Sequence, residues 1–324
     1  MQTHVGTSVE DACSYLENNH VIAIPTETVY GLAANAMSPD AIAKIYEIKN
    51  RPRFNPLILH IGHSRELEHY ITDIPKMMIP LVERYMPGPM TLLLPKREIV
   101  SDWVTSGSSK VAIRIPNHAL TLKLLQSLTF PLVAPSANIS GYVSPTSAYH
   151  VYKNLKGKIP YILDGGECTV GLESTIVGYS ESNNQIVIHR LGGLSISEIE
   201  DVIHEKVQLD ISHAQPDTPG QLRSHYATHT PLYAGNVDEL ISIFLDKKII
   251  TIRFQNQPHD SRIYREYIMS FRGDLIEAAH NLFSILRQAD EIGGDVILCE
   301  WAPNKGLGLA INDRIQRAQA ILKI

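Results

Sequence analysis

Between residues 8 and 208 the chain alternates short apolar runs with amphipathic segments. The runs are rich in Val and Ile and are bounded by Pro, Gly or Asn, which is typical of β-strands. Strands are predicted over residues 21–25, 56–61, 90–95, 111–116, 130–135, 161–164, 174–178 and 186–190. Apolar residues at helical spacing predict helices over 39–49, 120–128 and 196–207. Because strands and helices mix without strict alternation, the pattern favours a twisted mixed sheet over a doubly wound one.

The pattern changes between residues 209 and 230, where Pro, Gly and His replace the aliphatic residues. This composition is typical of a linker. Beyond it, apolar periodicity predicts alternating helices and strands over 237–245, 248–254, 274–288, 295–300 and 309–322. Clean alternation predicts a smaller, Rossmann-like α/β domain with a parallel sheet. We therefore predict a first domain over 1–208, a linker over 209–230 and a second domain over 231–324.

Composition narrows the class of protein. A length of 324 residues is roughly twice that of a typical domain, which supports the two-domain prediction. The net charge of −5 argues against nucleic-acid binding driven by bulk charge. Three cysteines without CxxC spacing disfavour both a disulfide framework and a zinc site. With no signal-peptide pattern and no apolar stretch of membrane-spanning length, the expected location is the reducing cytoplasm.

A polar turn follows the first predicted strand. Thr26, Glu27 and Thr28 bring two hydroxyls and a carboxylate to the strand end, where they could bind a polar ligand. The alternative is a capping turn, in which these side chains satisfy backbone donors. The sequence leaves both interpretations open.

Three cations lie at the end of the first long predicted helix. Lys49, Arg51 and Arg53 surround Pro52 and precede a buried strand. A single cation here would be explained by the helix dipole. Three cations in a stiff loop favour a clamp for a polyphosphate, with arginine supplying a fork and lysine a point charge.

Two arginines interrupt apolar strands. Arg114 lies within the predicted strand 111–116, and Arg190 closes the strand 186–190. A buried arginine must be paired, because an unpaired buried charge costs several kcal/mol. Each could form a structural ion pair, or could clamp the carboxylate of an amino acid substrate. The two interpretations are comparable for both residues.

Small polar residues follow two further strands. The segments 135–141 and 173–175 combine serine, threonine, asparagine and glutamate with nearby glycines. Such residues allow close backbone approach to a phosphate or a base edge, although an ordinary turn explains each segment separately. The chain has no P-loop motif, no complete dinucleotide-binding glycine motif and no nucleophile elbow. Chemistry by positioning and charge is therefore favoured over a protein nucleophile.

Taken together, these segments resemble the YrdC-like L-threonylcarbamoyladenylate synthases. The first domain carries the resemblance in residues 24–31, 49–52, 136–138, 173–176 and 190–192. Residues 219–227 and 306–314 resemble the long, two-domain form of that family. One departure is Thr228, which stands where the family has proline after His225-Tyr226-Ala227.

The resemblance implies a fold, a reaction and partners. The fold is a twisted mixed sheet with a concave cationic cleft. The reaction joins L-threonine, bicarbonate and ATP into L-threonylcarbamoyl-AMP and pyrophosphate, with Mg²⁺ accompanying the ATP and no metal site on the protein. The product passes to tRNA-modifying proteins for threonylcarbamoylation of tRNA. Such nucleotidyl transfer needs neutralised phosphates and aligned reactants.

The resemblance also implies residue roles. Lys49 and Arg51 would be catalytic. The ATP-binding residues would be Lys49, Arg53, Lys110, Ser136, Asn138, Ser144, Arg190 and Arg223. The threonine-binding residues would be Thr26, His60, Arg114, Ala134 and Ser174, with Arg114 taking the carboxylate. Tyr226 or Arg223 would close over the nucleotide, and no general base is identified.

A nucleic-acid-binding module remains the alternative function. A concave cationic cleft could hold RNA, but the net charge and the lack of interleaved exposed aromatics argue against that role. Carbamoyl-adenylate enzymes of the hydrogenase-maturation type share the fold implied by the resemblance. They carry zinc-finger cysteines, which three scattered cysteines do not provide.

Overall fold

The computed structural model describes residues 1–211, 226–258 and 260–320. Its helices are α1 Val9–Glu17, α2 Pro39–Lys49, α3 Leu67–Tyr70, α4 Ile79–Tyr85, α5 Asp102–Thr105, α6 Ala119–Ser127, α7 Ala148–Leu155, α8 Ile196–Ile203, α9 Val237–Ile241, α10 Leu275–Glu291 and α11 Gly308–Ala318, with short 3-10 turns at Ser64–Glu66 and Lys76–Met78. Its strands are β1 His4–Gly6, β2 Ile22–Ile24, β3 Gly31–Asn35, β4 Ile58–His60, β5 Met90–Pro95, β6 Lys110–Arg114, β7 Leu132–Val133, β8 Tyr161–Leu163, β9 Thr175–Ser180, β10 Gln185–Arg190, β11 Gln208–Leu209, β12 Leu232–Ala234, β13 Ile249–Arg253, β14 Ile263–Ile268 and β15 Val296–Cys299.

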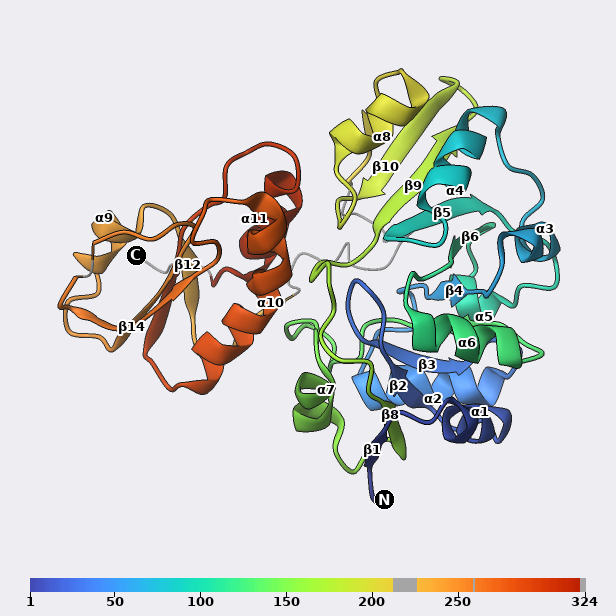
Figure 1. Cartoon of the computed structure of the whole chain (residues 1–324), viewed down its shortest axis with the longest axis horizontal. Helices are drawn as coiled ribbons and strands as arrows, with labels where there is room; N and C mark the ends of the chain where they lie inside the picture. Colours follow the sequence, from blue (N-terminus) through green and yellow to red (C-terminus); the bar gives the residue numbers. More distant parts are fainter. Residues whose placement is uncertain (212–225, 259, 321–324) are drawn as a thin grey trace.

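The first half of the chain forms a large mixed sheet (Figure 1). Over the described residues its strand order is β1-β8-β2-β3-β7-β4-β6-β5-β9-β10-β11. β4 runs parallel to β6 and antiparallel to β7, and β5 runs antiparallel to β6 but parallel to β9. The prediction of a twisted mixed sheet with a second α/β unit is confirmed. Each strand predicted before residue 208 is present, whereas β1, β3 and β11 of this sheet were missed.

Local sequence explains where α2 begins and ends. Ser38 caps its first turn by accepting from the backbone N–H of Ala41, and Pro39 occupies the first helical position. Ala41, Ile42, Ile45 and Tyr46 are buried. Asn50 ends the helix in the left-handed conformation, with φ of 50°. This sharp stop turns the chain at Arg51 toward the centre of the sheet.

The second half forms a separate four-stranded sheet. In the described part of the chain its order is β12-β15-β13-β14, and every neighbouring pair is parallel. This confirms the predicted parallel α/β unit. The predicted domain boundaries stay a prediction, although the large sheet ends at Leu209 and the small one begins at Leu232.

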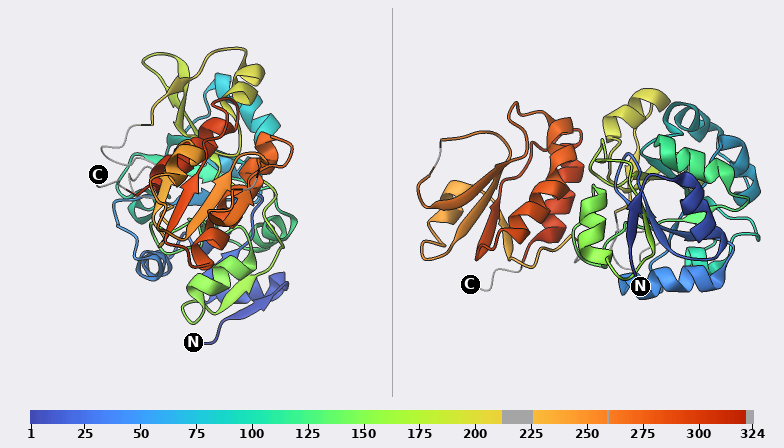
Figure 2. Two further views of the ribbon diagram at one scale, coloured as in Figure 1. Left: turned by 90° about the vertical axis from the view of Figure 1, so that its left-hand side faces the viewer. Right: turned by 60° about the horizontal axis from the view of Figure 1, so that its bottom comes forward.

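α10 and α11 lie between the small sheet and the first half of the chain (Figures 1 and 2). One hydrophobic cluster includes Val29, Val143 and Leu172 from the first half together with Phe283 and Ile311 from these helices. Apolar packing is therefore continuous between the two halves. None of the described helices is both long and apolar enough to cross a bilayer.

Candidate functional site

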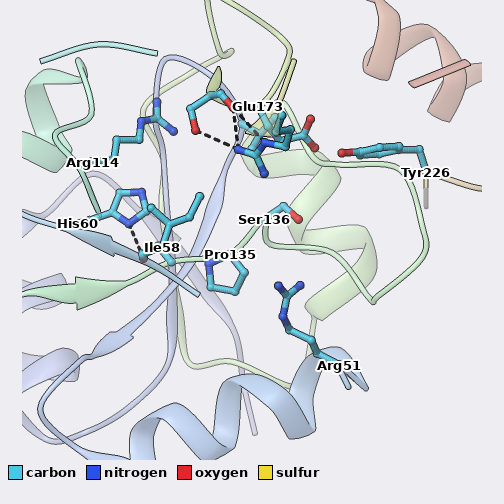
Figure 3. Close-up of a pocket in the computed structure, with 12 residues that line it drawn as sticks. Arg51, Ile58, His60, Arg114, Pro135, Ser136, Glu173 and Tyr226 are labelled. Carbon is cyan, nitrogen blue, oxygen red and sulfur yellow. Dashed lines mark hydrogen bonds between the residues drawn. The ribbon is translucent and has the colours of Figure 1, made fainter. Parts of the chain in front are cut away.

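A pocket opens where several strands and loops of the large sheet end (Figure 3). Its lining residues are Val29, Arg51, Ile58, His60, Arg114, Ala134, Pro135, Ser136, Glu173, Ser174, Arg190 and Tyr226. The structure thus brings together Arg51, His60, Arg114, Ala134, Ser136, Ser174 and Arg190, all of which the sequence predicts for the site. Residues predicted to bind the nucleotide and residues predicted to bind threonine share one pocket. Their individual roles stay predictions.

Sheet pairing explains why His60 and Arg114 lie side by side. The strands β4 and β6 are parallel neighbours, and their register places His60 opposite Arg114. Each residue ends its strand, so both side chains reach the same edge of the sheet (Figure 3). The backbone N–H of Ala134 bonds the carbonyl of Ile58 at 3.1 Å, which fixes the 134–136 loop beside them.

Arg114 forms the structural ion pair that is one of the two interpretations left open by the sequence. Its NH2 nitrogen lies 2.8 Å from Oε1 of Glu27, and both side chains are buried. Its Nε donates to the carbonyl of Gly88 at 3.3 Å. Arg114 is therefore part of a structural ion pair and also lines the pocket. Its role as a carboxylate clamp stays a prediction.

His60 is a neutral group in this pocket. Its exposed fraction is 2%, and Nδ1 lies 3.0 Å from the carbonyl of Ile58. Burial, together with the positive charge of Arg114, lowers the pKa of His60 to about 3. A carbonyl next to Nδ1 requires the proton on that nitrogen, which leaves Nε2 as a hydrogen-bond acceptor. This group can accept a hydrogen bond from a polar substrate.

Arg51 enters the pocket from the loop after α2 (Figure 3). Its Nε and NH2 donate to the carbonyls of Asn55 and Pro56 at 3.2 and 2.8 Å. Burial lowers the pKa of Arg51 to about 10, so it remains charged at neutral pH. Two backbone carbonyls hold this guanidinium, and no carboxylate among the described residues pairs with it. It is therefore suited to bind an anion.

Lys49 is buried, although the sequence predicts it for a clamp that binds a polyphosphate. Its exposed fraction is 1%. Its Nζ donates to the carbonyl of Asn138 at 2.6 Å and to that of Ser136. Burial, followed by the charge of Arg51, lowers the pKa of Lys49 well below its ordinary value. Lys49 therefore connects α2 to the 136–138 loop, and that contact shapes the pocket wall. Its predicted phosphate role is untested.

Asn138 and Ser144 are fully buried beside the pocket wall. Nδ2 of Asn138 donates to the carbonyls of Ile139 and Tyr142, at 2.9 and 2.8 Å. The hydroxyl of Ser144 donates to Oε1 of Glu173 at 2.6 Å. Both side chains therefore brace the loop that carries them.

Arg190 holds the start of β9. Its Nε and NH2 donate to the carbonyl of Ser174 at 3.0 and 2.8 Å, and NH2 reaches the Ser174 hydroxyl at 3.0 Å. That hydroxyl also lies 2.7 Å from the hydroxyl of Thr91. Burial lowers the pKa of Arg190 to about 10, so it too is charged at neutral pH.

Thr26, Arg53 and Lys110 are not part of this lining. The Thr26 hydroxyl donates to the carbonyl of Val29 at 2.6 Å, in the manner of a capping turn. Arg53 is exposed, with its guanidinium 5.1 Å from the centre of the Trp103 ring. Lys110 begins β6, at the opposite end from Arg114, and lines a separate surface hollow. Arg223 falls outside the described residues.

The sequence missed several contributors to the site. Val29, Ile58 and Pro135 supply its apolar walls, and a buried apolar residue beside polar strand ends was the available signal. Glu173 was recognised only as part of a polar turn. Arg287 and Arg314, which contact the site from the second half, left no signal because their partners are more than 130 residues away.

Comparisons with known proteins agree with this architecture. Residues 14–192 match the Sua5, YciO and YrdC family model, which is described as telomere recombination. Residues 194–320 match a model described as the C-terminal domain of threonylcarbamoyl-AMP synthase. The concave cationic cleft implied by the resemblance is not shown by these matches and stays a prediction.

Full-length relatives carry one name. A threonylcarbamoyl-AMP synthase of Pyrococcus abyssi is 40% identical, with 97% of this chain and 95% of that protein covered. One from Bacillus subtilis is 38% identical, with 96% and 92% covered. The crystal structure of P. abyssi Sua5 complexed with L-threonine superimposes with a TM-score of 0.89 at 37% identity, with 98% and 96% of the two chains covered. Because both halves match the family's models and the relatives align over nearly the whole length, this chain belongs to the two-domain, Sua5-type family of threonylcarbamoyl-AMP synthases.

Proposed function

We propose that this chain is a nucleotidyltransferase that makes L-threonylcarbamoyl-AMP and pyrophosphate from L-threonine, bicarbonate and ATP. The observation that carries the proposal is a single pocket in which three arginines from different elements meet a neutral histidine and buried hydroxyls. Cations suit the phosphates of ATP, and small polar groups suit an amino acid with a hydroxyl. The product would pass to proteins that transfer its threonylcarbamoyl group to tRNA.

The proposed chemistry needs no protein nucleophile. The amine of threonine adds to bicarbonate, and loss of water gives a carbamate. A carbamate oxygen then forms a bond to the α-phosphorus of ATP, and the bond to the bridging oxygen breaks to release pyrophosphate. Arg51 and Arg190, both charged at neutral pH, would bind phosphate oxygens and stabilise charge during transfer. Alignment of the carbamate with the α-phosphate of ATP would supply the remaining rate enhancement.

Threonine would occupy the part of the pocket near β4 and β6. Arg114 would bind its carboxylate while remaining paired with Glu27. Nε2 of His60 would accept a hydrogen bond from the substrate, and the Ser174 hydroxyl would contact its polar groups. The proximity of His60 and Arg114 in the sheet register supports this assignment. The P. abyssi relative, which was crystallised with L-threonine, supports threonine as the amino acid.

Mg²⁺ would arrive bound to ATP. Among the residues that the structure describes, no group of three or more His, Cys, Asp or Glu side chains is arranged to hold a metal ion. Mg²⁺ commonly keeps several waters and binds substrate phosphates instead of a protein cage, and it would neutralise phosphate charge here. We also propose a cytoplasmic location, which suits the free cysteines Cys13, Cys168 and Cys299.

Pyrophosphate release tests the proposal directly. With ATP, Mg²⁺ and bicarbonate present, release should depend on L-threonine. Serine should be a poorer substrate, because a missing methyl group loses about 1–3 kcal/mol. Mass spectrometry should detect L-threonylcarbamoyl-AMP as the second product. Equal release with leucine, or with no amino acid, would contradict the proposal.

A gel-shift experiment addresses the RNA-binding alternative. If RNA binding were the main function, the full-length protein should retard tRNA in the absence of ATP, in a salt-dependent manner. We expect no such shift at physiological salt, because the net charge is −5.

A further inference from the structure

The second half of the chain contacts the pocket wall through α10 and α11. These helices lie on the side of the second half that faces the first half, while the small sheet lies on their far side (Figures 1 and 2). Three facts show that the contact is close. His280 bonds the carbonyl of Thr169 at 3.2 Å. A Cβ on Gly171 would lie 2.5 Å from the His280 backbone. Phe283 stacks on Tyr226, with ring centres 5.2 Å apart.

Arg314 of α11 reaches Glu173, which lines the pocket. Its Nε and NH2 each lie 3.2 Å from Oε2 of Glu173, and Arg314 has an exposed fraction of 0%. Its third nitrogen, NH1, donates to Asp313 at 2.8 Å. The guanidinium lies 5.5 Å from the centre of the Tyr226 ring, which also lines the pocket. Arg314 therefore stands directly behind the pocket wall.

The two carboxylate oxygens of Glu173 bond different parts of the chain. Oε2 accepts from Arg314, and Oε1 accepts from the buried hydroxyl of Ser144 at 2.6 Å. Figure 3 shows Glu173 facing the pocket beside Tyr226. Ser144 and Glu173 come from separate loops, so the carboxylate connects one loop to the other and both to α11.

Arg287 of α10 holds the same Ser144 loop from behind. Its Nε donates to the carbonyl of Ser144 at 3.2 Å, and its NH2 donates to that of Val143. Its NH1 bonds the side chain of Asn154 at 2.9 Å. Two arginines of the second half therefore support Ser144, which belongs to the predicted nucleotide site. Arg287 bonds its backbone carbonyl, and Arg314 bonds Glu173, the partner of its hydroxyl.

We propose that Arg314 is a positioning residue for ATP: it balances the charge of Glu173 and holds Glu173 and Ser144 in the geometry that the nucleotide requires. This inference rests on the proposed function, and it gives the second half of the chain a specific part in the site. Burial alone would lower the pKa of Arg314, but Tyr226, Glu173 and Asp313 raise it above its ordinary value. The arginine is therefore charged throughout the working pH range.

Loss of Arg314 should affect ATP more than threonine. Without it, Glu173 would be a buried carboxylate that has lost the charge partner on α11, close to the place where Arg190 would hold phosphates. Repulsion between this carboxylate and the phosphates would weaken ATP binding. Threonine is expected near His60 and Arg114, which Arg314 does not contact in the described structure.

The test uses steady-state kinetics of pyrophosphate release with the full-length protein. Arg314→Met should raise the KM for ATP by about tenfold or more, and the KM for threonine by less than about threefold. In the double variant Arg314→Met with Glu173→Gln, the KM for ATP should return most of the way to the wild-type value, because the unbalanced negative charge of Glu173 is then removed. An unchanged KM for ATP in Arg314→Met, or a double variant no better than the single one, would overturn the proposal.

Arg253→Met is the matched control. Arg253 is buried in the same half of the chain, and it pairs with Asp238, Glu266 and Glu300. Its substitution should lower thermal stability but leave the KM for ATP within about twofold of wild type. A similar rise in the KM for ATP in this control would show that any damage to the second half produces the effect, which would overturn the assignment to Arg314.

Two further measurements keep the inference testable. If Arg314→Met does not fold, Arg314→Lys retains the charge but replaces the fork by one ammonium group, and the KM for ATP should rise about threefold. An unchanged value would overturn the proposal. Calorimetric ATP binding to wild type and variants tests the inference without turnover. If wild type binds ATP but releases no threonine-dependent pyrophosphate, the proposed function fails while the positioning role is still measured.

Discussion

At the residue scale, burial gives Arg51, Arg190 and His60 of the pocket a fixed charge state. Arg51 and Arg190 keep their charge because their pKa values fall only to about 10. His60 is neutral because its pKa falls to about 3. The pocket therefore offers permanent cations and a neutral acceptor across the physiological pH range.

Replacement of Arg51 should mainly affect turnover. Arg51→Ala should lower kcat/KM for pyrophosphate release by on the order of a hundredfold, because one preorganised cation near the phosphates is lost. Lys123→Ala removes an exposed cation that pairs with Glu10 on the surface, and it should have nearly wild-type activity. An Arg51→Ala enzyme that keeps its activity would show that the guanidinium only braces the loop.

His60 should make stability depend on pH. The unfolded chain takes up a proton near the ordinary histidine pKa of about 6.5, whereas the folded protein resists protonation down to about 3. Stability is therefore lost as pH falls from about 6.5 toward 3, and no such effect exists above that window. Between pH 7 and 4.5, His60→Gln should gain on the order of 2 kcal/mol relative to wild type in urea unfolding. Parallel stability curves for the two proteins would contradict this prediction.

Close backbone packing fixes the pocket wall at the element scale. The turn after β10 lies against the segment that enters β9, and Gly192 is at the contact. A Cβ on Gly192 would lie 2.3 Å from the carbonyl oxygen of Glu173 and 2.6 Å from the nitrogen of Thr175. Only a glycine fits without moving the 173–175 backbone.

Gly192→Ala should therefore displace the segment that carries Glu173 and Ser174. We expect a loss of activity together with a lower thermal midpoint, both measured on purified protein. Gly235→Ala is the control, because its Cβ would meet only the flexible side chain of Leu240 at 3.3 Å. Equal behaviour of the two variants would argue against backbone packing as the cause.

The two halves share apolar packing at the scale of the whole molecule. Tyr226 lies within the predicted linker, lines the pocket, and stacks on Phe283 of α10. The ring centres of Tyr226 and Phe283 are 5.2 Å apart. Phe244 stacks on Tyr233 in a comparable way, with ring centres 5.1 Å apart. The second pair belongs to a cluster formed within the second half.

This contrast allows a matched test. Phe283→Ala should lower stability by about 3–5 kcal/mol and reduce activity even at temperatures where the protein is folded, because Tyr226 loses its support at the pocket. Phe244→Ala should lower stability but retain activity. Circular dichroism and pyrophosphate release measured at one permissive temperature give both quantities. Full activity in Phe283→Ala would mean that Tyr226 is positioned independently of α10.

The amino-acid sequence by itself predicted most strands of the large sheet, the helices α2, α6 and α8, and most residues that line the pocket. Short apolar runs predicted the strands because side chains buried on a sheet must be apolar, and β4, β6 and β10 lie where the pattern placed them. Polar and cationic residues at the strand ends indicated the site, since those ends meet at one edge of the sheet. β1, β3 and β11 were missed because their patterns resemble loop segments.

Only the tertiary structure decided which partners each charge has. Arg114 pairs with Glu27, Lys49 bonds backbone carbonyls, and Glu173 is bound by Arg314 from far along the chain. Sequence patterns report local periodicity, whereas these contacts depend on how distant segments are brought together by packing. For the same reason the role of the second half could not be predicted from sequence: it depends on the faces of α10 and α11 that meet the pocket wall.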